Sequence, residues 1–141
     1  MSAIIKIRKG VNFKLKGRAE LVFGAVPTPA TYSVKPTAFH GLVPKLTVKT
    51  GDEVKAGTVL FYDKFNEKVK FTSPVSGQVS EIIRGEKRRL LEVRIIPEKE
   101  IHYEQFPISD PNNLSSDEVK SAILQAGLWP MLRQRPYDVI A

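Results

Sequence analysis

The stretch Val48–Gly77, VKTGDEVKAGTVLFYDKFNEKVKFTSPVSG, decides the fold of this chain. Glycine turns at Gly51 and Gly57 bracket a short segment. An apolar run, a polar loop, an alternating segment and a Ser-Pro-x-Ser-Gly turn follow in that order. Glycine, aspartate and proline at such short intervals are typical of tight turns between strands. The stretch therefore predicts a small domain that is mainly β.

The strands are predicted from the spacing of apolar residues. The run Val59–Tyr62 suits a strand that is buried on both faces, whereas Val69 and Phe71 alternate with lysines, as in a strand with one solvated face. The same alternation occurs at two other places, namely Leu91, Val93 and Ile95, and Ile5 and Ile7. Turns at this spacing are expected for a small barrel or sandwich.

Three regions follow from this pattern: a β domain over residues 1–96, a polar linker over 97–113, and a capped helix with an apolar tail over 114–141. Residues 24–44 contain four prolines, so we expect an extended loop that lies across the sheet surface. Ser115 and Glu118 form a capping-box pattern, and Gly127 is placed to end the helix. The apolar tail is expected to lead into a missing C-terminal part of a longer protein.

Composition restricts the function classes. The chain has no cysteine, which excludes disulfides, thiolate metal sites and cysteine nucleophiles. It has neither a secretory signal nor a run of about 20 apolar residues that could cross a bilayer. Its formal net charge is +7. A solubilising surface charge explains this better than a basic RNA-binding β domain, so no nucleic-acid partner is expected.

The order of turns and strands is similar to that of biotinyl and lipoyl carrier domains, in which a lysine at a hairpin tip carries the prosthetic group. Here the tip is expected at Asn66-Glu67, with Lys64 and Lys68 beside it rather than on it. The sequence therefore predicts the fold of a biotinyl/lipoyl carrier, a barrel-sandwich hybrid, without biotin or lipoyl. A true carrier domain remains an alternative.

Other candidate sites leave alternatives open. The basic turn Arg84–Arg89 could grip phosphates or could be a solvated hairpin. His40 and His102 lack a second ligand at metal spacing, so no metal is expected. The tail Trp129–Tyr137 could form an apolar pocket for a flat ligand or could anchor the next domain. No catalytic triad, phosphate loop or dinucleotide motif occurs, so no catalytic residue is predicted.

The chain resembles the N-terminal region of the A subunit of the sodium-translocating NADH:quinone oxidoreductase. The similarity covers nearly the whole chain in the right order, and the Arg84–Arg88 turn and the Gly127–Trp129 tail are its most specific parts. The other matching segments are 5–10, 48–57, 60–64, 69–77, 132–133 and 135–137.

The resemblance implies a peripheral subunit on the cytoplasmic face of the bacterial inner membrane, attached to membrane-bound partner subunits of a sodium-exporting complex. NADH and flavins would be bound by those partners. This chain would be non-catalytic by itself and would face a quinone, either ubiquinone or menaquinone. The alternative is a carrier-like adaptor of a related Rnf-type electron-transport complex.

The resemblance also suggests two quinone-facing segments. The first, Phe39–Pro44, keeps an aromatic residue, a glycine and a large apolar residue, but Val43 replaces an arginine that is usual in the family. The second is the tail from Trp129 to Tyr137. At the hairpin, Glu67-Lys68 replaces a usual Pro-Gly turn. The expected quinone-facing residues are Phe39, Gly41, Leu42, Trp129, Arg133, Arg135 and Tyr137.

Overall fold

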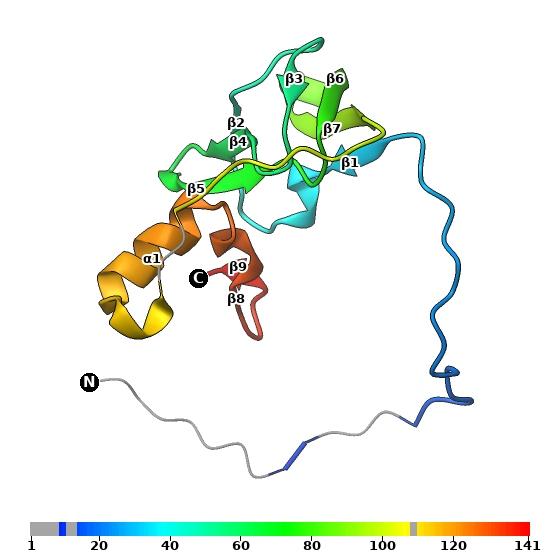
Figure 1. The fold of residues 1–141 in the computed structure, drawn as a ribbon, viewed down its shortest axis with the longest axis vertical. Coiled ribbons are helices and arrows are strands. Elements are labelled where there is room, and N and C mark those ends of the chain that lie inside the picture. The colour runs from blue at the N-terminus through cyan, green and yellow to red at the C-terminus, as the bar shows by residue number, and fades with distance from the viewer. Residues whose placement is uncertain (1–8, 11–13, 108–109) are drawn as a thin grey trace.

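Two small antiparallel sheets form the body of the protein, in a computed structural model that describes residues 9–10, 14–107 and 110–141 (Figure 1). The first sheet has the order β1 (Tyr32–Val34), β7 (Leu90–Pro97), β6 (Gly77–Arg84) and β3 (Glu53–Val54). The second has the order β2 (Pro44–Leu46), β4 (Val59–Asp63) and β5 (Asn66–Thr72). The strand expected at Ile5 and Ile7 lies outside the described residues.

The core contains aliphatic side chains from both sheets together with an aromatic stack. Phe61 and Phe71 stack with ring centroids 4.8 Å apart, and Phe39 meets Phe71 edge-on at 4.6 Å. Full burial of one such side chain stabilises the fold by about 1.5–3 kcal/mol. The largest apolar side chains that are fully buried are Phe61, Leu60, Ile95, Val79, Val93 and Pro130.

The predicted strands are confirmed with one shift. Val59–Tyr62 lies in β4, and Val69 and Phe71 are buried in β5, as expected. In β7, however, the buried residue at the start is Leu90 and not Leu91, which is only half-buried. The register shifts where Arg84 pairs with Leu90, and this irregularity interrupts the simple alternation.

The position expected for the hairpin tip was wrong. β4 and β5 are joined by the two-residue turn Lys64-Phe65, because Asp63 pairs with Asn66. The Asp63 carboxylate accepts a hydrogen bond from the Phe65 N–H at 3.2 Å, which favours a turn two residues earlier than expected. Lys64 therefore occupies the tip. The absence of biotin or lipoyl stays a prediction, which the intact mass of the protein from its natural host tests.

The proline-containing segment 24–44 also differs from expectation. It does not lie across a sheet surface, because its second half leads from β1 through a 3-10 turn, Pro36–Ala38, to β2. β1 pairs with β7 and β2 pairs with β4, so each sheet gains an edge strand. Residues 14–30 are exposed and extend away from the body (Figure 1).

Residues 98–104, here called the strap, run along the core after β7. The Ala56 N–H donates to the His102 carbonyl at 2.9 Å, and the Glu104 N–H donates to the Ala56 carbonyl at 2.8 Å. The buried hydroxyl of Ser76 accepts from the His102 N–H at 2.9 Å. These bonds attach the strap to the β domain, which it leaves in the direction of the helix.

The helix α1 (Ser116–Gln125) follows a 3-10 turn at Pro111–Asn113 and has the predicted cap. The Ser115 hydroxyl accepts from the Glu118 N–H, and the Glu118 carboxylate accepts from the Ser115 N–H, which completes the capping box. Gly127 ends the helix at φ 70°, as predicted. The chain then forms a 3-10 turn, Trp129–Met131, and the short pair β8 (Arg133–Gln134) and β9 (Val139–Ile140). None of the helices described here is long and apolar enough to cross a membrane.

Candidate functional site

The structure brings together the two segments that the sequence singled out. The Arg133 guanidinium lies over the Phe39 ring, with its carbon 4.5 Å from the ring centroid. This is a cation–π contact between residues separated by 94 positions. Phe39 also packs edge-on against Phe71 of β5, so the contact lies directly on the aromatic core.

Hydrogen bonds hold Arg133 in this position. One guanidinium nitrogen donates to the Ala38 carbonyl at 3.4 Å and the other to the Asp138 carbonyl at 3.0 Å. The Asp138 carboxylate is 3.9 Å from Arg133 and 3.6 Å from Arg135. The Arg133 side chain is 19% exposed and that of Arg135 is 80% exposed. Arg133 is thus an ordered, half-buried cation, while Arg135 projects into solvent.

Trp129 also packs against the core. Its ring is half-buried against the core, and its indole N–H donates to the Ala141 carbonyl at 2.7 Å. The 3-10 turn that carries Trp129 packs on β5, the strand that supplies Phe71. The contact between Phe39 and Arg133 and the turn that carries Trp129 both lie against β5, and these three residues are here called the Phe39–Arg133 surface.

The other predicted residues lie at its margins. Leu42 packs against the core and lines a separate hollow beside β2. Gly41 is exposed at φ 76°, and an added Cβ would meet no atom within 4 Å. Tyr137 is exposed and projects away from the body. The structure therefore brings Phe39 and Arg133 into contact and places the turn that carries Trp129 against the adjoining strand β5, whereas Gly41, Arg135 and Tyr137 are exposed.

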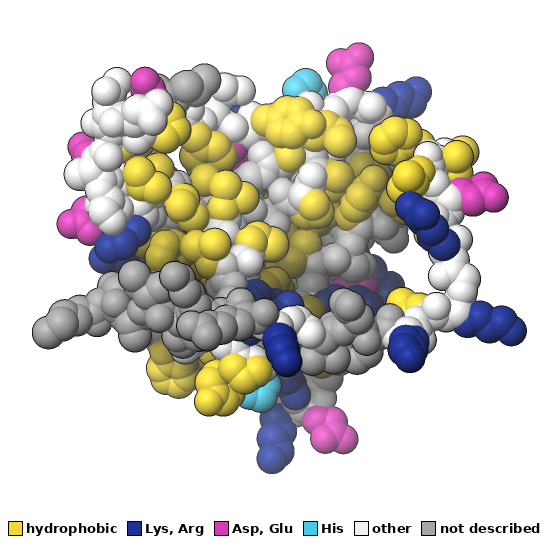
Figure 2. All heavy atoms as spheres, turned by 90° about the horizontal axis from the view of Figure 1, so that it is seen from below, with side chains coloured by type: hydrophobic (Ala, Val, Ile, Leu, Met, Phe, Trp, Pro, Cys, Tyr) yellow, Lys and Arg dark blue, Asp and Glu magenta, His cyan; other side chains and the backbone are white. Residues whose placement is uncertain are grey.

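Apolar side chains are exposed beside this surface. They come from the segment after α1 and are Leu128, Met131, Leu132 and Tyr137. Figure 2 shows hydrophobic side chains gathered over much of the side of the molecule that is seen from below.

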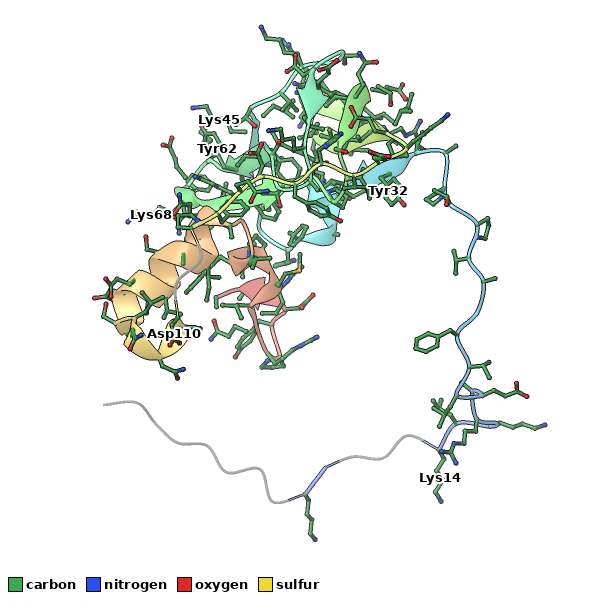
Figure 3. All side chains as sticks on the ribbon, in the orientation of Figure 1. Lys14, Tyr32, Lys45, Tyr62, Lys68 and Asp110 are labelled. Atoms are coloured by element: carbon green, nitrogen blue, oxygen red, sulfur yellow. The ribbon has the colours of Figure 1, made fainter. Side chains whose placement is uncertain are left out.

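No group of three His, Asp or Glu side chains that could hold a metal ion occurs among the described residues. Figure 3 shows Lys45 and Tyr62 side by side, and this pair is a cation–π contact at 5.4 Å. The pKa of Glu92 is lowered by hydrogen bonds from the Ser33 hydroxyl and then from Arg94. The contact between Ser33 and Glu92 joins β1 to β7, so the lowered pKa of Glu92 reflects the pairing of these two strands.

Sequence reasoning missed two residues of the site. Asp138 fixes both arginines, and the spacing Arg133-x-Arg135-x-x-Asp138 was a readable signal, because opposite charges so close in sequence can pair. Phe71 supplies the surface on which Phe39 rests. The alternation of apolar residues and lysines in this strand identified Phe71 only as a core residue. No local sequence signal distinguishes a core residue from one that also supports Phe39.

Comparison with known proteins identifies a family for most of the chain. A family model described as the NqrA N-terminal barrel-sandwich hybrid domain matches residues 5–98. The chain belongs to the NqrA family. The predicted family and fold class are thereby confirmed, since the two packed sheets lie within the matched region.

Relatives over nearly the full chain are named as the A subunit of Na(+)-translocating NADH-quinone reductase. One from Neisseria meningitidis serogroup A is 43% identical over 97% of this chain and 31% of its own length. One from Pseudomonas aeruginosa is 36% identical over the same shares. One from Photorhabdus laumondii is 35% identical over 96% of this chain and 31% of its own. The chain thus spans about a third of the length of these relatives.

Proposed function

We propose that this chain forms the N-terminal domain of the A subunit of a sodium-translocating NADH:quinone oxidoreductase and faces the quinone with its Phe39–Arg133 surface. The quinone would be ubiquinone or menaquinone. The contact between Phe39 and Arg133 carries the proposal, because it joins two distant segments in which the family resemblance suggests quinone contacts.

The chemistry of the surface suits this ligand. A quinone is a flat ring with two carbonyl oxygens and an apolar tail. Trp129 and Phe39 offer aromatic surface for the ring, and Arg133 offers N–H donors to a carbonyl oxygen. Exposed apolar side chains at Leu128 and Met131 lie close in the sequence to Trp129 and suit an apolar tail.

The proposed role is structural and supportive rather than catalytic. NADH oxidation and flavin chemistry would belong to partner subunits, and this domain would help to place the quinone end of the electron path. The exposed apolar side chains after α1 would contact the rest of the subunit or a partner. The domain would then lie at the cytoplasmic face of the bacterial inner membrane, attached through those partners.

Trp129 makes the proposal testable, since it is the single tryptophan of the chain. A soluble ubiquinone analogue with a short tail is titrated onto the chain, and onto the longer subunit, while tryptophan fluorescence is recorded. For the longer subunit, the fluorescence of its Trp129→Phe variant is recorded under the same conditions and serves as the reference. We expect the quenching of Trp129 fluorescence to saturate. A parallel titration of free N-acetyltryptophanamide corrects for light absorbed by the quinone. A linear response equal to that of the free amide in both proteins would refute the proposed surface.

A matched pair of variants distinguishes a specific contribution of Arg133 to quinone binding from a general effect of positive charge. Arg133→Gln removes the cation that lies on Phe39, whereas Arg135→Gln removes an equal charge that is 80% exposed. We expect about a tenfold loss of quinone affinity for the first, because a hydrogen bond to a charged group contributes about 1.5–3 kcal/mol, and little change for the second. Equal effects of the two variants would count against the assignment. Circular dichroism confirms that both variants are folded.

A further inference from the structure

We propose that a groove between β2 and the turn joining β6 to β7 binds the phosphate headgroup of an anionic phospholipid. The groove has a volume of about 450 Å³. It is separate from the Phe39–Arg133 surface apart from Leu42, which lies at its edge. Its wall combines three arginines with apolar residues, and the arginines Arg84, Arg88 and Arg89 are here called the groove arginines.

The turn that supplies the arginines is tightly built. Lys87 and Arg88 both have left-handed backbone conformations, with φ of 52° and 60°. The Gly85 N–H donates to the Arg89 carbonyl at 2.8 Å, and Arg84 donates through its guanidinium to the Arg88 carbonyl at 3.1 Å. Two successive residues without glycine in this conformation are strained, and such strain is concentrated at functional sites. The turn thus has a defined backbone, and the hydrogen bond to the Arg88 carbonyl orients the Arg84 guanidinium.

The groove arginines form no ion pair with the part of the chain that the structure describes. Among residues 9–10, 14–107 and 110–141, every ion pair involves other side chains. Arg94 of β7, by contrast, pairs with Glu81 and Glu92. Three guanidinium groups that face one hollow repel each other, and a phosphate would relieve this repulsion through bidentate hydrogen bonds. The arrangement therefore points to an anion with several oxygen acceptors.

The apolar side of the groove indicates a lipid rather than a free phosphate. Leu42, Pro44 and Leu46 contribute to the opposite wall, and Val43 there is 39% exposed. At Val43 this chain has an apolar residue, so the wall offers no additional charge. A phospholipid joins a phosphate diester to glycerol and acyl carbons, and both parts find a matching wall. A soluble phosphate would leave the apolar wall in contact with water.

The experiment measures vesicle binding of the whole 141-residue chain by flotation. Vesicles of phosphatidylcholine alone are compared with vesicles that contain equal parts of phosphatidylcholine and phosphatidylglycerol. We expect binding to the anionic vesicles only. Changing all three groove arginines to glutamine is expected to lower the partition coefficient by roughly 100-fold, since each cation near an anionic surface contributes about a fivefold factor.

A second triple variant controls for net charge. Lys49→Gln, Lys55→Gln and Lys99→Gln remove the same charge from exposed positions outside the groove. If the site exists, the partition coefficient of this control should be at least tenfold higher than that of the groove variant. If the groove variant is misfolded by circular dichroism, Arg89→Gln alone replaces it, because the Arg89 side chain makes no hydrogen bond to the described residues.

Each other outcome overturns the assignment. Equal losses in the two triple variants would show general charge attraction. Displacement from vesicles by millimolar inorganic phosphate at constant ionic strength would show that the anion is a free phosphate. Tighter binding to a single-stranded RNA than to the vesicles would show a nucleic-acid site. Quinone titration of the groove variant should be unchanged, which separates this inference from the proposed function.

Discussion

Gly77 is the position where a single methyl group should do most damage to this fold. It has φ 149°, and a Cβ built on it would lie 2.0 Å from the Ile96 carbonyl oxygen. An ordinary contact requires at least 3.4 Å, so the two backbones would have to separate by about 1.4 Å. Gly77 pairs with Pro97 of β7 and with Val54 of β3, so the shift would disrupt both edges of β6.

The cost of Gly77→Ala follows from these contacts. Loss of two ladder hydrogen bonds at about 1 kcal/mol each, with backbone strain of about 1–3 kcal/mol, gives roughly 3–5 kcal/mol. This is a large part of the 5–15 kcal/mol that is typical of the free energy of unfolding of a domain. The melting temperature should fall by roughly 15 °C or more. Urea unfolding followed by circular dichroism measures the change.

A second glycine provides the control. Gly51 also has positive φ, at 95°, but its added Cβ would meet no atom within 4 Å. Gly51→Ala should therefore cost only the conformational part, about 1–2 kcal/mol. If the two variants lower the free energy of unfolding equally, the close approach of Gly77 to Ile96 is not what the fold depends on. The reasoning from Cβ contacts would then be refuted.

Three further predictions concern the core and the helix. Phe71→Leu should destabilise the protein by about 1–2 kcal/mol because Phe71 contacts two aromatic rings, while Phe65→Leu at the exposed hairpin tip should stay within about 0.5 kcal/mol in urea unfolding. Ser115→Ala removes the cap of α1 and should cost the helix about 1 kcal/mol, seen as faster amide hydrogen exchange confined to α1; unchanged exchange would contradict the cap. Hydrogen bonds from the Ser115 hydroxyl and backbone hold the pKa of Glu118 below its ordinary value, so this stabilisation is present above the unfolded pKa and is lost as pH falls through the lower folded pKa. Carbon-13 NMR of the Glu118 carboxylate should show the lowered midpoint, and Ser115→Ala should raise it.

The parts of the fold that depend on neighbours in sequence were predictable. Val59–Tyr62 forms a strand and Ser115 caps a helix because each signal is complete within a few residues. The hairpin tip was not predictable, since Asp63 and Asn66 both favour turns and only their pairing selects between two registers. Leu91 was misplaced for a similar reason, because an irregularity in pairing leaves no mark in the sequence of β7.

The candidate site shows the same division more sharply. The resemblance identified Phe39 and Arg133 separately, but their contact depends on how the tail folds back over β5. Composition identified the cations of the Arg84–Arg89 turn, but it could not show that they face apolar residues of β2. Both arrangements arise from packing between distant segments, which periodicity and propensity do not describe.

The strap has a mechanical consequence. In a carrier domain the attached group moves freely about a flexible tether, whereas here the chain that leaves β7 is fastened to Ala56 and Ser76. A force applied through residues 98–104 would therefore act directly on the turn that contains Ser76, next to the crowded backbone at Gly77. Through these hydrogen bonds, a displacement of the chain beyond the strap would be passed to the strands that flank Ala56 and Ser76.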